Sequence, residues 1–317
     1  STEDCTTSKT TIKNEYWPDQ VLSLPVPVVF HVITKTDGSG NVTDQQIHDQ
    51  IQVLNEDFGA IVGTMGANGF DTKIRFMLAG ITRSSNDSWF NDENQSAYKQ
   101  ALAWNTTKYL NVYTNSASGN LGYAYYPQDM AGQMLDGIVL LYTTVGGRNN
   151  GAHDGLYDQG RTLVHEVGHY FGLLHTFEGG CGDGYEAGDL IADTNTEEID
   201  HYSCVQTNTC GTPDPIHNYM NYTDDDCMTH FTAEQANRMI CSLVNYRPEL
   251  SATYYAPING NLQQMTSNLI FREEKFNILT WDVNPLNNGK IVKYLITRKG
   301  EKASSYSDLT ELNGLTY

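Results

Sequence analysis

Residues 165–175, HEVGHYFGLLH, constrain the fold of this chain more than any other segment. Side chains four residues apart lie on the same face of an α-helix, so His165 and His169 can offer their imidazoles to one ion. Glycine readily adopts the backbone conformation that ends a helix, and Gly172 therefore allows the chain to reverse. After this reversal His175 can supply a third nitrogen. The spacing predicts a metal site with three histidine ligands.

Glu166, directly after the first of these histidines, indicates the chemistry of the site. Three nitrogen ligands leave the fourth position of a tetrahedral zinc ion open for a water molecule, whose pKa the metal lowers. A neighbouring carboxylate can accept a proton from this water and pass it to a leaving amine, while the metal polarises the scissile carbonyl. We therefore expect zinc-dependent endopeptidase chemistry, with Glu166 as the general base and acid.

An alternative interpretation is a helix whose histidines are satisfied by ordinary hydrogen bonds. By chance alone, the five fixed positions of the motif would occur together in only about one of every tens of thousands of such chains. This rarity favours the metal site. The other histidines lack the spacing, and we expect them at the surface or in hydrogen bonds: His31, His48, His153, His201, His217 and His230.

The hydrophobic pattern predicts an α+β fold in which a twisted mixed sheet is backed by helices. The β-branched run at residues 26–34 indicates a central strand. Thr43 and Gln46 match a capping box, and they begin a helix whose apolar positions continue to Phe58. Further strands are expected at residues 74–82, 109–114, 121–126 and 137–143, the metal-binding helix at 161–174, and another helix between the Thr232 cap and Pro248.

Two domains are expected, residues 1–250 with an N-terminal extension at 1–24, and residues 251–317. Beyond residue 250 the sequence changes to short alternating strands at 276–281 and 290–298, with an Asn-Asn-Gly turn before the second. Trp281 and Tyr294 in these strands resemble a fibronectin type III module. About 60 residues remain for it, fewer than the ~100 of a complete sandwich, which predicts a partial module.

Charge and cysteine content restrict the class of protein. Acidic residues outnumber basic ones 38 to 19, for a formal net charge of -19, which argues against a nucleic-acid partner. No apolar run approaches the ~20 residues of a membrane-spanning helix. Four of the six cysteines fall within residues 181–227, a segment without clear periodicity, as expected for disulfides formed in an oxidising compartment. We therefore expect a secreted protein.

The extended histidine motif resembles that of the metzincin peptidases, and residues 217–222, HNYMNY, resemble their Met-turn. Residues 175–181, 188–189, 193–194 and 214–228 resemble the pappalysin family more narrowly, and its compact microbial members in particular. The resemblance extends over residues 26–246. It implies a metzincin-like catalytic domain whose irregular lower part is stapled by disulfides.

The resemblance also implies roles for three residues outside the histidine motif. Met220 would form a hydrophobic floor beneath the zinc, where the alternative is ordinary core packing. Tyr222 would stabilise the oxyanion. Asp225 would lie in the S1′ pocket and favour Arg or Lys after the cut bond, although Asp224 and Asp226 flank it and the assignment could shift by one residue. A solvated acidic loop is the alternative.

A structural calcium site is implied at Asp189, Thr194 and Glu197, where hard oxygens would fix an irregular segment. The sequence departs from the family here, because Asn195 replaces a frequent proline. The family pattern also suggests disulfides between Cys181 and Cys210 and between Cys204 and Cys227. Cys5 and Cys241 are then left for each other.

The sequence is compatible with two functions. In the first, the chain is an endopeptidase, and a protein or peptide substrate binds as an added strand along residues 121–126. The chain would then be the mature enzyme, because Cys5 lacks the Arg-Cys-Gly surroundings of a cysteine that keeps such enzymes latent. In the second, the chain is a non-catalytic, metal-stabilised adhesion or binding module, which the sandwich-like tail favours. Glu166 argues against the second function because a binding module has no need of the base. The sequence leaves the oligomeric state and natural substrate open.

Overall fold

The computed structural model describes residue 5, residues 13–21, 23–147 and 155–252, and the backbone of four strands between residues 267 and 313. The chain divides into two compact units, Ser1–Ser251 and Ala252–Tyr317. Within the described residues, no helix combines the length and apolar composition needed to cross a bilayer.

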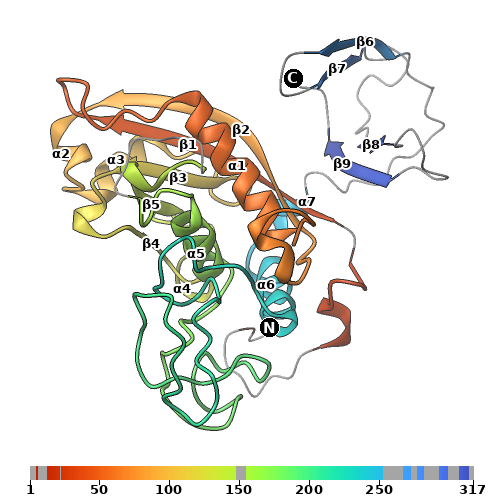
Figure 1. Cartoon of the computed structure of the whole chain (residues 1–317). Helices are drawn as coiled ribbons and strands as arrows, with labels where there is room; N and C mark the ends of the chain where they lie inside the picture. The colour runs from red at the N-terminus through yellow and green to blue at the C-terminus, as the bar shows by residue number, and fades with distance from the viewer. Residues whose placement is uncertain are drawn as a thin grey trace. The chain divides into compact units, whose positions relative to one another are not determined.

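A five-stranded sheet forms the upper part of the first unit (Figure 1). Its strands follow the order β2-β1-β3-β5-β4, and only β4 is antiparallel to its neighbour. A parallel strand that is covered on both faces of its sheet is apolar along most of its length. Strand β1 fits this rule, because every residue except its last is buried. The predicted central strand is confirmed. The strands are β1 (Leu24–Thr34), β2 (Ile74–Ser85), β3 (Leu110–Asn115), β4 (Gly122–Ala124) and β5 (Ile138–Leu141).

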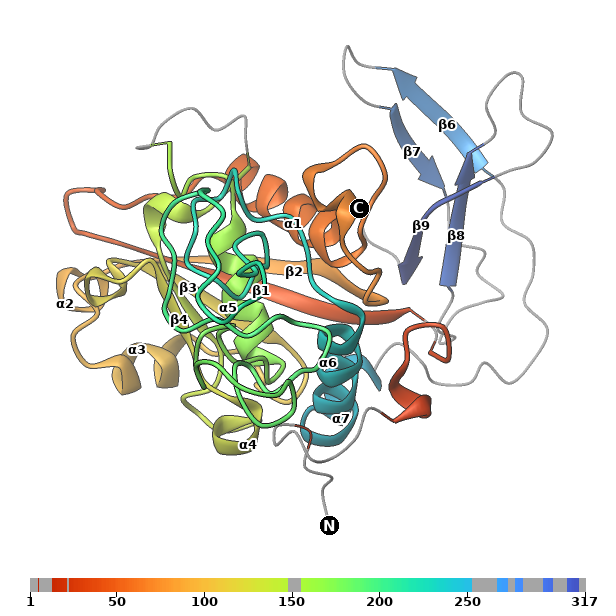
Figure 2. The same ribbon diagram turned by 60° about the horizontal axis from the view of Figure 1, so that its bottom comes forward.

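Figure 2 shows the three longest helices of the first unit, two of which contact this sheet. They are α1 (Asp44–Phe58), α5 (Arg161–Tyr170) and α6 (Ala233–Tyr246). The predicted capping box begins α1, and Thr232 forms a second box with Gln235 at the start of α6. Helix α1 contacts β2, while α5 contacts α1, β4 and β5. The helix that carries two of the histidines is therefore held against the edge of the sheet.

The predicted end of the histidine-bearing helix is wrong by four residues: α5 ends at Tyr170, not at residue 174. Gly172 adopts φ +90°, and the backbone N–H groups of Gly172 and Leu173 donate to the carbonyls of His169 and Gly168. These two bonds form a Schellman motif, which closes a helix by turning its last carbonyls inward. The apolar residues that follow belong to the reversal, so hydrophobic periodicity alone overestimates the helix.

Several shorter elements were not predicted, because one or two turns are too few to establish a periodic pattern. They are α2 (Asp87–Phe90), α3 (Gln95–Leu102), α4 (Pro127–Met130), α7 (Pro248–Ala252) and the 3-10 turns η1 (Asn14–Tyr16), η2 (Met65–Asn68), η3 (Ala117–Gly119) and η4 (Tyr142–Thr144).

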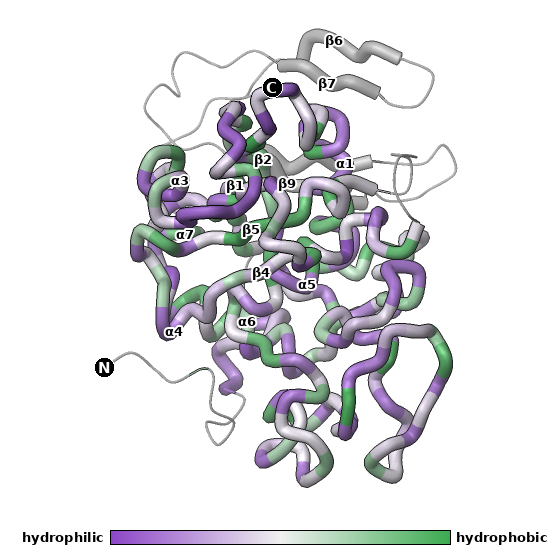
Figure 3. The backbone as a smooth tube through the Cα atoms, turned by 90° about the vertical axis from the view of Figure 1, so that its left-hand side faces the viewer, coloured by the Kyte–Doolittle hydropathy of each residue, from purple (hydrophilic) through white to green (hydrophobic). Residues whose placement is uncertain are grey.

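Residues 171–232 contain neither a helix nor a named strand, as the sequence predicts. In Figure 3 this segment alternates over short distances between hydrophilic and hydrophobic residues. Two disulfides hold it, Cys181–Cys210 and Cys204–Cys227, and a third, Cys5–Cys241, joins the N-terminal segment to α6. All three expected pairings are confirmed.

The second unit contains two antiparallel strand pairs. The predicted turn at residues 287–289, and parts of the predicted strands 276–281 and 290–298, lie outside the described residues. The division into a catalytic domain at 1–250, with its extension at 1–24, and a fibronectin type III-like module at 251–317 stays a prediction. The strands are β6 (Ser267–Arg272), β7 (Asn277–Trp281), β8 (Lys293–Arg298) and β9 (Ser307–Asn313).

Candidate metal centre and substrate cleft

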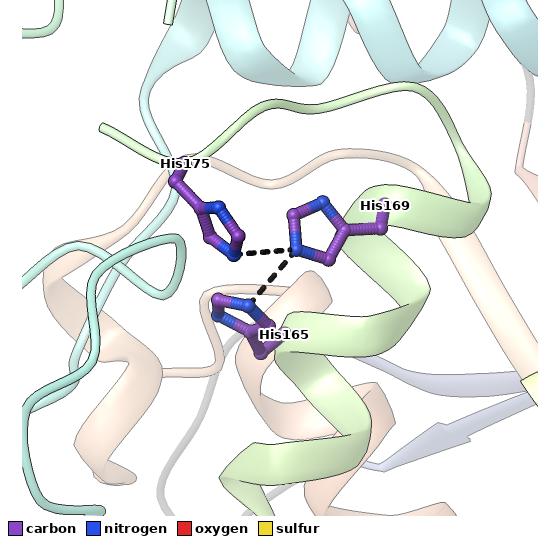
Figure 4. A group of neighbouring side chains, drawn as sticks. All are labelled: His165, His169 and His175. Carbon is purple, nitrogen blue, oxygen red and sulfur yellow. Dashed lines mark hydrogen bonds between the residues drawn. The ribbon is translucent and has the colours of Figure 1, made fainter. Parts of the chain in front are cut away.

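Three imidazoles converge where α5 meets the chain that returns after Gly172 (Figure 4). The Nε2 atom of His169 lies 3.0 Å from Nε2 of His165 and 3.0 Å from Nε2 of His175. Two nitrogens bound to a tetrahedral zinc ion are separated by about 3.3 Å, given Zn–N bonds of about 2.0–2.1 Å. The three predicted histidines are therefore spaced as a shared metal ion requires.

The hydrogen-bond partner of Nδ1, the ring nitrogen that points away from the other two histidines, fixes the tautomer of each ring. Nδ1 of His165 and Nδ1 of His169 each lie 2.7 Å from a backbone carbonyl oxygen, and Nδ1 of His175 lies 3.0 Å from a carboxylate oxygen of Glu178. Because all three partners are acceptors, Nδ1 carries the hydrogen and Nε2 presents a lone pair. Three lone pairs directed at one point repel one another, and a cation at that point removes the repulsion.

Burial also favours the neutral form of these rings, which is the form that binds metals. It lowers the pKa of His169 to about 4, and with the nearby His169 it lowers the pKa of His175 to about 3. Burial and the two neighbouring histidines lower the pKa of His165 as well. All three rings are neutral at physiological pH, so the donor set suits zinc.

Glu166 lies next to the histidines and is buried, and burial raises its pKa to about 8; a cation held by the histidines would lower this pKa again and keep the carboxylate ionised. It lines the same cavity as all three imidazoles. The edge strand β4 passes close by: a methyl group at Gly122 would approach within 3.2 Å of Glu166 Oε1. The carboxyl group is thus enclosed between α5 and the edge of the sheet, where it can reach a bound water or substrate.

Met220 and Tyr222 both lie at this centre. Met220 is fully buried, and its sulfur packs so closely on α5 that a side chain at Gly168 would overlap it. The Tyr222 ring centroid lies 4.8 Å from that of His175 and 5.7 Å from that of His165. Burial raises the pKa of Tyr222 to about 12, so its hydroxyl keeps the proton it needs to donate a hydrogen bond.

Asp225 is buried at the N-terminus of α5. Its Oδ2 accepts hydrogen bonds from the backbone N–H groups of Gln159 and Arg161, at 2.8 and 3.2 Å. Burial raises the pKa of Asp225 to about 7, although these bonds oppose the shift. Asp225 lines the cavity, whereas Asp224 and Asp226 do not. The carboxylate therefore has a structural partner in the helix as well as access to the cleft.

A cavity of about 600 Å³ joins these groups. The edge strand β4 borders it, and this strand is Gly122–Ala124, shorter than the strand predicted at residues 121–126. Its role in substrate binding stays a prediction. Sequence patterns did not reveal several residues of the wall, because they belong to irregular segments or to the buried face of α5. Those missed are Tyr157, Arg161, Thr162, Tyr202 and Thr223.

The residues of the expected calcium site are all buried. Asp189 Oδ1 accepts a backbone hydrogen bond from Ile191. Glu197 accepts hydrogen bonds from Thr176 and Asn221, and it forms an unpredicted cluster with His201 and Asp214. His201 Nε2 lies 3.1 Å from Asp214 Oδ2, in keeping with the expectation that this histidine is hydrogen-bonded.

The fold and the three-histidine centre define a metzincin-type zinc metallopeptidase. A family model described as Pregnancy-associated plasma protein-A, peptidase family M43, matches residues 80–244. An extracellular metalloprotease of Colletotrichum graminicola is 37% identical over 236 residues, which cover 71% of this chain and 78% of that protein. Extracellular metalloprotease 1 of Coccidioides posadasii is 38% identical over 226 residues, covering 68% and 75%.

Among solved structures, mature mirolysin of Tannerella forsythia in complex with a cleaved peptide is similar, with a TM-score of 0.62 and 33% identity. The match covers 73% of this chain and 96% of that one. The chain belongs to the pregnancy-associated plasma protein-A, or pappalysin, family of metallopeptidases. This membership supports a hydrolase that acts on proteins or peptides, in place of the non-catalytic module.

Proposed function

We propose that the chain is a secreted endopeptidase whose zinc is held by His165, His169 and His175. The observation that carries this proposal is the convergence of three Nε2 lone pairs beside a buried carboxyl group in one cavity. When bound there, zinc supplies a Lewis acid that polarises a carbonyl and lowers the pKa of water. The extracellular relatives and the three disulfides support secretion.

Glu166 accepts a proton from the attacking water and later donates it to the leaving amine. Its position between α5 and β4 keeps it near the carbonyl carbon of a substrate lying along the edge strand. The Tyr222 hydroxyl donates a hydrogen bond to the oxyanion that develops from the carbonyl oxygen. Met220 supports the imidazoles from below through packing on α5.

The substrate binds in an extended conformation beside β4. This strand pairs with β5 on one side only, because it is the last strand of the sheet. Its other side can therefore exchange backbone hydrogen bonds with a peptide, which provides affinity without dependence on sequence.

Asp225 selects Arg or Lys at P1′. The hydrogen bonds from α5 use Oδ2, so Oδ1 can face a cationic side chain in the cleft. Of the three adjacent aspartates, it is the one that lines the cavity, which favours it over Asp224 and Asp226. A guanidinium or ammonium group in this buried site would restore full ionisation of the carboxyl group.

A structural calcium ion at Asp189, Thr194 and Glu197 is proposed from the family resemblance and from the burial of these oxygen ligands. Adding Ca²⁺ to chelator-treated protein reloaded with zinc should raise its thermal midpoint. An unchanged midpoint would exclude the calcium site.

The test of the catalytic proposal is Glu166→Gln, which keeps the size of the side chain and removes the base. We expect zinc content to stay at the wild-type level and peptide cleavage to fall by about 10²–10⁴-fold. His169→Ala serves as the comparison, because it should lose zinc and activity together. Undiminished cleavage by Glu166→Gln would overturn the assigned role.

The test of specificity is Asp225→Asn, which keeps an oxygen acceptor for the α5 N–H groups but removes the charge. A cleavage-site profile on denatured proteins should lose its preference for Arg and Lys at P1′ by at least about 10-fold relative to other residues. Asp226→Asn, at an exposed position outside the cavity, should leave the profile unchanged. A wild-type profile without this preference would remove the assignment.

A further inference from the structure

Tyr202 is a large aromatic residue that lines the cleft yet is 61% exposed. Its ring centroid lies 5.9 Å from that of Tyr222, which in turn lies 4.8 Å from that of His175. A line of rings thus extends outward from the metal centre to the rim. Exposed aromatic surface next to a cleft is unfavourable in water and is typical of a binding surface.

The backbone on both sides of Tyr202 is held by contacts that need no ligand. The carboxamide oxygen of Asn221 accepts the backbone N–H of Tyr222 at 2.8 Å and the backbone N–H of His201 at 3.2 Å. One side chain therefore ties the Tyr202 segment to the Met-turn, and the Cys204–Cys227 disulfide adds a covalent tie. An aromatic side chain on a backbone held in this way loses little entropy when a ligand packs on it.

The surface around Tyr202 continues into the Asp225 site. Tyr157 lines the same cavity as Tyr202. The preceding residue, Leu156, is 48% exposed, and its carbonyl accepts the backbone N–H of Asp225 at 2.9 Å. Exposed apolar surface therefore lies next to the residue proposed for P1′, in the segment that contains Tyr157.

We propose that Tyr202 and Tyr157 form a second substrate subsite, which binds a large apolar or aromatic side chain two or three positions after the cut bond. This inference rests on the proposed endopeptidase function. The two ring steps place Tyr202 within about 11 Å of His175, and an extended peptide advances about 3.3 Å per residue. At most about three residues span this distance, and the side chain at P1′ is assigned to Asp225, so the residue next to Tyr202 is P2′ or P3′, and leucine or phenylalanine fits the surface.

The experiment compares quenched peptides with Arg at P1′ and with Gly, Leu or Phe placed in turn at P2′ and P3′. For the wild type, Leu or Phe at one of these positions should raise kcat/KM about 5- to 10-fold over Gly, mainly through a lower KM. Tyr202→Ser should abolish this gain, so that its kcat/KM values for the Gly, Leu and Phe peptides become equal. Tyr202→Phe, which keeps the ring, should retain it.

Tyr185→Ser is the matched control, because Tyr185 is a partly exposed tyrosine whose hydroxyl contacts Glu234 away from the cleft. It should behave as the wild type with every peptide. Equal kcat/KM values for Tyr202→Ser and the wild type on the Leu and Phe peptides would overturn the subsite. An equal fall on all peptides, carried by kcat, would also overturn it, because it would reflect a disturbed catalytic centre.

A binding measurement separates this inference from the catalytic one. Labelled Leu and Gly peptides are titrated into Glu166→Gln protein with and without Tyr202→Ser, and fluorescence anisotropy gives Kd. The ratio of the Kd values of the Gly and Leu peptides should fall about 5- to 10-fold when Tyr202 is replaced. Failure of the catalytic proposal alone would appear as unchanged cleavage by Glu166→Gln, whereas failure of the subsite would appear as an unchanged ratio of Kd values.

Discussion

The outer nitrogens of the three converging imidazoles have unequal partners. Those of His165 and His169 face backbone carbonyls, which the fold holds in place. That of His175 faces the carboxylate of Glu178, a side chain that is 49% exposed. His175 is also stacked on Phe177, with ring centroids 4.9 Å apart. The orientation of the third ring therefore depends on side chains that the solvent can reach.

At the residue scale we predict that Glu178→Ala weakens zinc binding by about 10- to 100-fold, because the partner that orients the His175 ring is removed. Glu178→Gln keeps an acceptor oxygen and should lose less. Competition with a chromogenic chelator measures the affinity. Glu198→Ala, in the same irregular segment but outside the cavity, should bind zinc as the wild type does. Wild-type affinity in Glu178→Ala would show that the ring is oriented without Glu178.

At the scale of elements, the edge strand and the histidine helix behave as one unit because β4 lies directly against Glu166. A methyl group at Gly122 would come within 3.0 Å of Glu166 Cγ and 3.1 Å of Leu140 Cδ2. Both distances are too short for ordinary packing, so either the strand or the carboxyl group would have to move. The glycine fixes how closely the edge strand and the Glu166 carboxyl group approach each other.

We therefore predict that Gly122→Ala lowers kcat/KM about 10- to 100-fold while zinc content stays unchanged, because displacement of a catalytic group by a fraction of an ångström to one ångström has effects of this size. Steady-state kinetics and metal analysis measure the two quantities. Gly147→Ala provides the control, since its added methyl would meet nothing nearer than 3.4 Å. Wild-type kinetics in Gly122→Ala would show that the contact is accommodated.

At the scale of the whole molecule, the N-terminal segment is joined to α6 far along the chain. The Cys5–Cys241 disulfide spans 236 residues. Asn237 donates a hydrogen bond to the carbonyl of Lys13, and Asn245 donates one to the Tyr16 hydroxyl. These contacts lie on α6, not on the cavity, so they stabilise the first unit without taking part in the site.

Replacing Cys5 and Cys241 by serine should lower the free energy of unfolding by about 2–5 kcal/mol, because the unfolded chain gains conformational freedom. Denaturant titration measures this change, and activity at low denaturant should match that of the wild type. Asn245→Ala keeps the disulfide and removes the hydrogen bonds to the Tyr16 hydroxyl and the Cys241 carbonyl, so it should cost about 1–2 kcal/mol, less than loss of the disulfide. Equal losses in the two variants would contradict the larger role of the disulfide.

The local features of the fold could be predicted from neighbouring residues. The caps at Thr43 and Thr232, the central strand β1 and the i,i+4 pair of histidines are set by side chains within a few residues of one another. The third histidine could be added because Gly172 marks a reversal. The roles of Met220 and Tyr222, by contrast, came from family resemblance, since nothing in their spacing indicates a metal.

Only the tertiary structure decided which distant residues meet. It ended α5 at Tyr170, placed Asp225 and not its neighbours in the cleft, and brought Tyr202 to the rim. It also set Glu178 against the third imidazole. These residues lie in segments without a repeating pattern, where disulfides and buried hydrogen bonds fix the path of the chain. The sequence alone determined the chemistry of the centre, because helical periodicity acts between residues within one turn of each other. The tertiary structure decided the shape of the cleft, because that shape depends on contacts between remote segments.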